Sequence, residues 1–152
     1  MDDLQKLGAK SVPVVSKGDK FVFAQVIRDV IEFLEIDEDP SPELSPYELN
    51  QRFEGILETT IKLVKQFPNS SLKNLLPNRP RTWKVLLHHV FQIPKAFLDH
   101  EENDLEFTYE MMTEEPPEIL KTSKNIAVFG EQICKKFRYW WVKSKDSDFF
   151  VN

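Results

Sequence analysis

The chain has 152 residues, a formal net charge of −5 and 41% hydrophobic residues, which suits one domain with an appendage. The acidic balance argues against a phosphate-binding surface, so no nucleic-acid partner is expected. Cys134 is the single cysteine and cannot close an intramolecular disulfide, which favours the reducing cytoplasm. The acidic start Met1–Asp3 leads into no apolar run, and no stretch approaches the ~20 apolar residues of a membrane span. We therefore expect a cytoplasmic protein with no membrane partner.

Residues 1–36 have the pattern of a β-hairpin followed by a helix. Two apolar runs, Val12–Val15 and Phe21–Phe23, flank a turn at Ser16–Asp19 that contains a glycine. Short β-branched and aromatic runs around such a turn are typical of a hairpin. From Gln25 to Leu34 apolar residues recur at helical spacing, which predicts a helix.

The stretch 37–45 is acidic and rich in proline, which predicts a linker. Ser45 and Glu48 then predict a helix start, because the serine hydroxyl can accept the Glu48 N–H while the carboxylate reaches back. We expect this helix to run from Pro46 to about Gln66 and to open a helical bundle over residues 46–152. Further helices are predicted at Thr82–His100, as a single turn at Tyr109–Met112, and at Ser123–Lys143.

Each long helix has an apolar stripe at spacings of three and four residues, which we expect to face the core. The first stripe is Leu49, Phe53, Ile56, Leu57, Thr60 and Val64. The second is Trp83, Leu86, Leu87, Val90, Ile93 and Phe97. The third is Ile126, Gly130, Ile133, Phe137, Trp140 and Trp141. The glycine in the third stripe would let another backbone or a ligand approach closely.

The string Lys6–Val15, with Ser-Val-Pro-Val-Val at its end, resembles the last part of a glutaredoxin. In that family a helix end leads into a strand that opens with Val-Pro, and a hairpin strand and a final helix follow. The resemblance covers residues 1–36 and implies a thiol contact at Val12 and Pro13. Glutaredoxin chemistry needs a low-pKa thiolate on a Cys-x-x-Cys or Cys-x-x-Ser turn, yet no cysteine precedes Cys134. We therefore interpret Val12 and Pro13 as the relic of a thiol site and expect no redox activity.

The stretch Thr82-Trp83-Lys84-Val85-Leu86-Leu87-His88-His89-Val90 resembles the second helix of DinB-like bundles. This superfamily includes maleylpyruvate isomerases and bacterial thiol S-transferases. The resemblance extends over residues 46–143 and implies a bacterial protein with a divalent metal, in which His89 takes a ligand position. The other two ligands of that family come from a His-x-x-x-His pair, which is missing here.

The three histidines of the chain are poorly placed for a shared metal. His88 and His89 are neighbours on a helix and point about 100° apart, and His100 follows about three turns later. We expect no metal. The simplest interpretation is that His89 flanks the core with a satisfied hydrogen bond and that His88 faces solvent.

The expected fold class is mainly α, with a DinB-like, four-helix-bundle-type, up-and-down bundle after the hairpin and helix of a glutaredoxin remnant. Only three long helices follow the linker, so one position of a four-helix bundle is vacant. The apolar helix Gln25–Leu34 could fill it, or a second subunit could. We expect a homodimer.

The residues that we expect to bind a ligand are His89, Arg81, Trp83 and Gly130. Arginine forms bidentate pairs with carboxylates, although a solvated loop is the simpler interpretation of this segment. No catalytic motif is recognised, and none frames Cys134, so a structural or unremarkable surface role is expected for it.

These patterns predict a non-redox, metal-independent binding or interaction protein without a resident cofactor. Both resemblances point to families that handle low-molecular-weight thiols. A transferase or isomerase that depends on glutathione or a similar thiol is therefore the alternative. A purely structural homodimer subunit is the third possibility.

Overall fold

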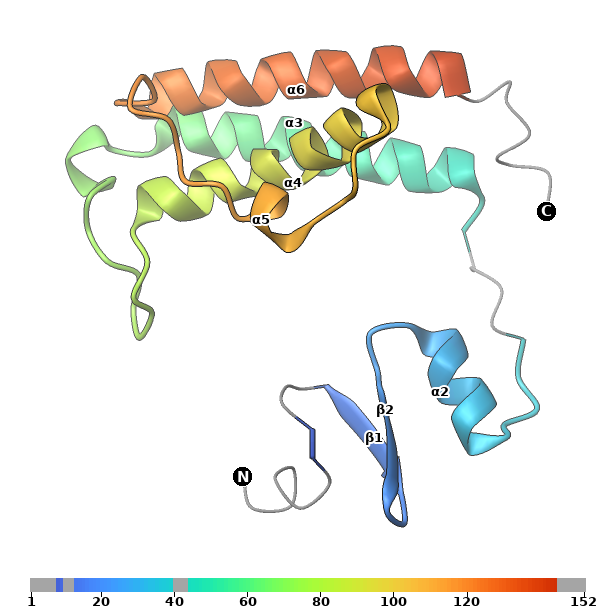
Figure 1. The fold of residues 1–152 in the computed structure, drawn as a ribbon. Coiled ribbons are helices and arrows are strands. Elements are labelled where there is room, and N and C mark those ends of the chain that lie inside the picture. The colour runs from blue at the N-terminus through green and yellow to red at the C-terminus, as the bar shows by residue number, and fades with distance from the viewer. Residues whose placement is uncertain (1–7, 10–12, 40–43, 145–152) are drawn as a thin grey trace. The chain divides into compact units, whose positions relative to one another are not determined.

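A computed structural model describes residues 8–9, 13–39 and 44–144, and it divides the chain into two compact units (Figure 1). The units are Met1–Glu43 and Leu44–Asn152, so the boundary falls inside the predicted linker. The described part is mainly helical and has one two-stranded antiparallel sheet, which confirms the expected class at that level. No helix in these ranges is long and apolar enough to cross a membrane.

The N-terminal unit contains the predicted hairpin. Strands β1 (Val14–Lys17) and β2 (Lys20–Phe23) pair antiparallel, with Val15 opposite Val22. Gly18 has a φ of 63° in the turn, a left-handed conformation that glycine adopts without a steric penalty. The strands extend further into the predicted turn than expected, because the glycine allows the chain to reverse within two residues.

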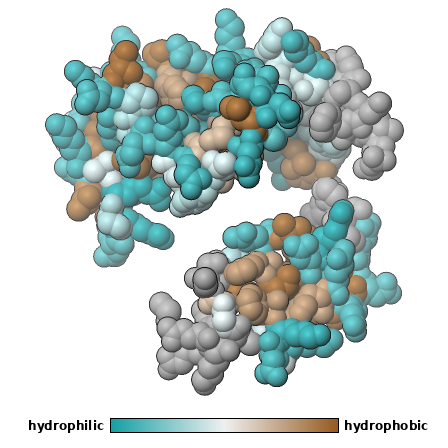
Figure 2. All heavy atoms as spheres, in the orientation of Figure 1, coloured by the Kyte–Doolittle hydropathy of each residue, from teal (hydrophilic) through white to brown (hydrophobic). Residues whose placement is uncertain are grey.

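A short helix, α2 (Ile27–Leu34), follows the hairpin and begins two residues later than predicted. Val26 has an extended backbone at the N-cap position, and Glu35 ends the helix with a left-handed φ of 56°. Val30 is its buried residue, whereas Val26 and Ile27 are exposed. Figure 2 shows a broad hydrophobic area on the visible face of this unit. Among the described residues of this unit, only Ala9 and Val30 are buried apolar residues.

Over its described residues, 44–144, the second unit contains three long helices and two short ones. They are α3 (Pro46–Gln66), the 3₁₀ turn η1 (Asn69–Ser71), α4 (Trp83–Asn103), α5 (Tyr109–Met112) and α6 (Ser123–Ser144). The predicted capping box at the start of α3 is confirmed. Ser45 Oγ accepts from the Glu48 N–H at 3.3 Å, and Glu48 Oε2 accepts from the Ser45 N–H at 2.9 Å. These reciprocal bonds fix the first turn of α3.

The direction of α6 contradicts a simple up-and-down bundle. Asn69 Oδ1, just after α3, accepts from the Ser123 N–H at 2.8 Å, so α6 begins where α3 ends. The Lys84 N–H donates to Leu72 O at 2.9 Å, so α4 begins at that same end. Accordingly, α4 and α6 run in the same direction, and the segment from residue 104 to 122 returns along α4 (Figure 1). A connection of this length can cross back, so alternating directions were not required.

The hydrophobic core lies where α6 packs against both α3 and α4. The stripe predicted for α6 faces this core, with Ile126, Gly130, Ile133 and Phe137 buried and Trp140 half-buried. The other two helices contribute Leu57, Ile61, Val64, Phe91 and Leu98.

Two of the predicted stripes are partly wrong. On α3, Leu49 and Ile56 are exposed, whereas Ile61 is buried outside the predicted stripe. On α4, Ile93 is exposed, and Phe91 and Leu98 are fully buried instead. The helix α4 is covered by α6 and by α5, so its buried residues are not confined to one stripe. The helix α3 has two apolar faces, and spacing alone does not tell which of them meets the core.

Candidate functional site

The start of α4 is held by a backbone network. Thr82 Oγ1 accepts from the Val85 N–H at 3.3 Å and caps the helix. The Leu76 N–H donates to Arg81 O at 2.8 Å, and the Trp83 N–H donates to Asn74 O at 3.1 Å. These bonds fix the position of Arg81 directly before the N-cap residue Thr82.

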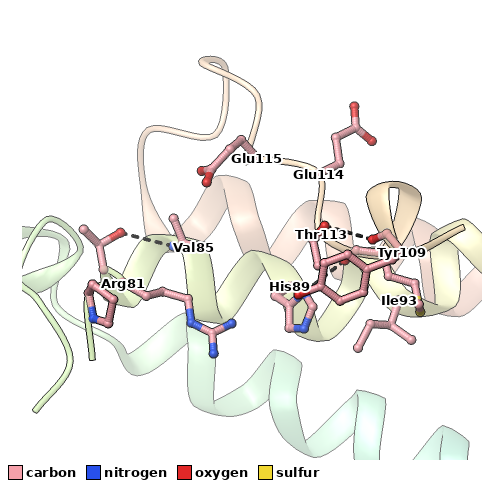
Figure 3. Close-up of a pocket in the computed structure, with 11 residues that line it drawn as sticks. Arg81, Val85, His89, Ile93, Tyr109, Thr113, Glu114 and Glu115 are labelled. Atoms are coloured by element: carbon pink, nitrogen blue, oxygen red, sulfur yellow. Dashed lines mark hydrogen bonds between the residues drawn. The ribbon is translucent and has the colours of Figure 1, made fainter. Parts of the chain in front are cut away.

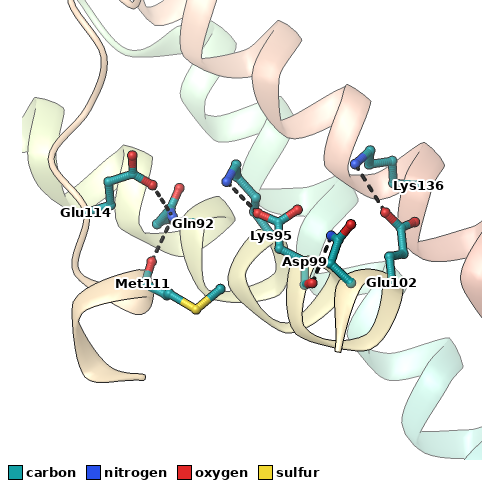
Figure 4. Close-up of polar contacts among 8 residues, drawn as sticks. Gln92, Lys95, Asp99, Glu102, Met111, Glu114 and Lys136 are labelled. Atoms are coloured by element: carbon teal, nitrogen blue, oxygen red, sulfur yellow. Dashed lines mark hydrogen bonds and ion pairs between the residues drawn. The ribbon is translucent and has the colours of Figure 1, made fainter. Parts of the chain in front are cut away.

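The segment around α5 lies against the middle of α4. Gln92 is almost fully buried, and its Nε2 donates to Met111 O at 2.8 Å and to Glu114 Oε2 at 3.0 Å (Figure 4). His89 Nδ1 lies 3.0 Å from Met112 O. Three polar contacts therefore tie residues 111–114 to α4. Sequence reasoning missed the role of Gln92, although a glutamine between Phe91 and Ile93 is an unusual polar residue in an apolar stretch.

Between α4 and this segment lies a hollow of about 560 Å³, which we call the α4–α5 cleft. Its volume lies in the range of small-molecule sites. The residues that line it include Arg81, Val85, His89, Ile93, Tyr109 and Glu115. Figure 3 shows that Arg81 and His89 reach the same side of α4, while Glu114 and Glu115 project from the loop after α5.

The hydrogen bond to Met112 sets the tautomer of His89. A carbonyl oxygen only accepts, so Nδ1 carries the proton. In a neutral imidazole Nε2 then keeps its lone pair and accepts a hydrogen bond or a proton. The predicted hydrogen bond of His89 is thus present, and its partner is a backbone carbonyl 23 residues away.

The environment of His88 is the reverse of the expectation. It is only 1% exposed, its ring stacks on Phe129 at 5.2 Å, and Nδ1 has no hydrogen-bond partner among the described residues. Burial lowers the pKa of His88 to about 4, an effect that Glu114 opposes and that Lys84, His89 and Lys95 reinforce. The prediction of a solvent-facing His88 is wrong, because the core contact of α4 is centred on His88, Phe91 and Leu98.

Two predicted ligand residues lie outside the α4–α5 cleft. The ring of Trp83 packs on Phe67, with centroids 5.3 Å apart. Gly130 is buried at the contact of α6 with α4, where a Cβ atom would lie 2.6 Å from the ring of Phe91. The close approach expected at Gly130 is therefore made by an aromatic side chain of the protein itself.

The two residues of the predicted thiol relic are only partly described. Val12 lies outside the described residues. Pro13 directly precedes β1, and its carbonyl accepts from the Ala24 N–H at 3.0 Å, which continues the hairpin pairing.

Cys134 lies in the core of the helical unit. It is 3% exposed, and burial raises the pKa of its thiol. A thiol in such surroundings is a poor nucleophile. Within the described ranges, no group of three or more histidine, cysteine, aspartate or glutamate side chains is arranged to hold a metal ion.

Comparison of the chain with protein-family models, with curated proteins and with solved structures gave no match. The site is therefore argued from its own chemistry. Two of the four predicted ligand residues, Arg81 and His89, come together in one cleft.

Proposed function

We propose that the helical unit is a non-redox binding module whose α4–α5 cleft takes a small carboxylic acid. The observation that carries this proposal is that Arg81 and His89 line the same hollow of about 560 Å³. A guanidinium binds a carboxylate through two parallel hydrogen bonds. In the part of the chain that the structure describes, no side chain pairs with the guanidinium of Arg81, which leaves it available to a ligand.

The remaining walls narrow the ligand class. Glu114 and Glu115 bring negative charge to the loop that faces α4, so a ligand gains if it carries an ammonium group beside its carboxylate. His89 Nε2 accepts a hydrogen bond from an N–H, O–H or S–H group. Amino acids and short peptides combine these features.

Within that class we propose a low-molecular-weight thiol such as glutathione. The support is the resemblance of residues 1–36 to glutaredoxins and of Thr82–Val90 to DinB-like bundles, since both families handle such thiols. The protein would then be related to DinB-like and glutaredoxin-like proteins and would have lost the redox cysteine of one and the metal ligands of the other.

Calorimetric titration of the full chain with glutathione and with cysteine tests the binding site. Arg81→Gln removes the charge from the cleft, and we expect it to weaken binding about 10- to 100-fold. Arg79→Gln removes the same charge from a neighbouring exposed position outside the cleft, so it should bind like the wild type. Binding that is equal in both variants, or absent in the wild type, would contradict the proposal.

A second candidate function, thiol transfer, is favoured by His89 Nε2, which makes no hydrogen bond within the described residues. As a general base, this nitrogen would take the S–H proton of the thiol. The thiolate would then form a bond to an electrophilic carbon, and the leaving group would depart with the electron pair of the broken bond. The proton would stay on the imidazole until it passes to solvent.

The transfer is measured with glutathione and a chlorinated nitroarene, from which chloride departs. We expect His89→Gln to lower the rate at least about 100-fold, because a general base contributes that much. His100→Gln is the matched control and should keep the rate. A wild-type rate no higher than that of buffer alone would refute the thiol-transfer function. The calorimetric titration would then still test the binding function.

A further inference from the structure

Three lysines from separate segments line one hollow at the end of the helical unit where α4 and α6 begin. Lys73 follows the turn η1, Lys84 lies in the first turn of α4, and Lys121 precedes α6. The hollow has a volume of about 650 Å³, which lies in the range of small-molecule sites. We call it the lysine hollow.

Hydrogen bonds hold the three segments of the lysine hollow together. The Lys84 N–H donates to Leu72 O at 2.9 Å, which brings the start of α4 to the residue before Lys73. Asn69 Oδ1 accepts from the Ser123 N–H at 2.8 Å and from Ser123 Oγ at 3.0 Å, which ties the start of α6 to the turn η1. Contacts of the protein itself therefore hold the backbone around the hollow, which lowers the entropy cost of binding a ligand there.

The charge of these lysines is not neutralised by ion pairs. Within the described residues, no carboxylate forms an ion pair with Lys73, Lys84 or Lys121. Glu118 also lines the lysine hollow, but it pairs with none of the three. The hollow thus combines three positive charges with one negative charge, and an anion that enters it is attracted by all three ammonium groups.

Asn69 adds an uncharged donor to the lysine hollow, which it lines. Because the Ser123 N–H can only donate, the amide oxygen of Asn69 faces it, and the amide NH₂ group keeps its donors. That group has no acceptor among the described residues. The dipoles of α4 and α6 favour an anion at this end as well, although the first N–H groups of both helices, those of Trp83 and Ser123, already bond within the protein. The contacts to a ligand therefore come from side chains.

We propose that the lysine hollow binds the phosphate group of a small organic phosphate. A lysine ammonium is a compact point charge that suits a phosphate, whereas a planar carboxylate matches the fork of an arginine. A phosphate monoester carries about −1.5 to −2 charges near neutral pH, so several ammonium groups are needed to balance it. The net charge of −5 opposes a long polyanion such as nucleic acid, but it does not describe how the lysines are distributed. The site is separate from the α4–α5 cleft, since no residue lines both.

Titration of the full chain with inorganic pyrophosphate at low ionic strength, followed by NMR of the backbone amides, tests the site. We expect Lys84→Gln to raise the dissociation constant of pyrophosphate about 10-fold, because it removes one charge-assisted contact. Lys135→Gln is the matched control. It removes the same charge from another lysine-lined hollow, in which Lys95 and Lys136 are each paired with a carboxylate, so it should bind like the wild type. Arg81→Gln should also keep the binding, because Arg81 lines the α4–α5 cleft.

A parallel titration with citrate separates phosphate recognition from a general attraction of anions, and citrate should bind more weakly than pyrophosphate. Absence of pyrophosphate binding, equal affinities for both anions, or equal losses in Lys84→Gln and Lys135→Gln would overturn the proposal. Loss of pyrophosphate binding in Arg81→Gln alone would place the anion in the α4–α5 cleft and would overturn it too. Circular dichroism verifies that each variant folds.

Discussion

His88 and His89 are neighbours in α4 with opposite surroundings. The ring of His88 is buried against Phe129, and the ring of His89 reaches the α4–α5 cleft. A step of about 100° around the helix is enough to separate them. A buried neutral imidazole acts in packing, whereas the accessible ring of His89 is the one that we propose for ligand binding.

The burial of His88 predicts a pH dependence of stability. Its pKa is about 4 in the folded protein, against about 6.5 in an unfolded chain. Between these two pH values the unfolded state binds more protons than the folded state. The free energy of unfolding therefore rises as the pH increases from about 4 to about 6.5, and above pH 6.5 the contribution of His88 is complete. Its size is at most about 3 kcal/mol.

Urea unfolding at a series of pH values measures this dependence. In the wild type it includes the titration of carboxylates, so the difference from His88→Leu isolates the histidine. We expect the slope in the acidic window to be smaller in His88→Leu and unchanged in His100→Gln. Parallel pH curves of the wild type and His88→Leu would refute the assignment.

At the scale of elements, the contact between α4 and α6 depends on the pairing of Gly130 with Phe91. A Cβ atom at Gly130 would lie 2.6 Å from the Phe91 ring, which is fully buried and has little space to move. We expect Gly130→Ala to lower the free energy of unfolding by about 1–3 kcal/mol, the usual cost of overpacking. Thermal or urea unfolding measures the change.

Gly55 is the matched control for Gly130. It lies in the middle of α3 and is exposed, and a Cβ atom there would meet no atom within 4 Å. Gly55→Ala should therefore raise stability by about 0.5–1 kcal/mol through helix propensity. If Gly130→Ala is destabilising because of the ring, adding Phe91→Leu should cost less in that variant than in the wild type. Additive effects would argue against the proposed clash.

At the scale of the whole molecule, the helical unit contains its own core. Every member of the buried hydrophobic cluster lies between Leu57 and Phe137. The unit also includes Ser45 and Glu48, which cap its first helix. A fragment of residues 44–152 should therefore keep the helical circular dichroism of the full chain and unfold cooperatively. Loss of that signal would mean that residues 1–43 are required for the core.

Local signals determined the positions of the elements. The capping box at Ser45, Gly18 in the hairpin turn and the regular apolar spacing each act within a few residues, so the sequence alone placed the hairpin and the long helices to within a few residues. It also singled out Arg81, because arginine forms bidentate pairs with carboxylates, and His89, because of the resemblance of its helix to DinB-like bundles.

Only the tertiary structure decided which faces meet. Leu49 and Ile56 fit a core stripe as well as Leu57 and Ile61 do, and packing against α6 selected the second pair. The same contacts buried His88, filled the space at Gly130 with Phe91, and brought residues 109–115 beside Arg81 and His89. Helix propensity and capping are short-range effects, whereas these choices depend on burial between segments far apart in the chain, which a local pattern does not encode.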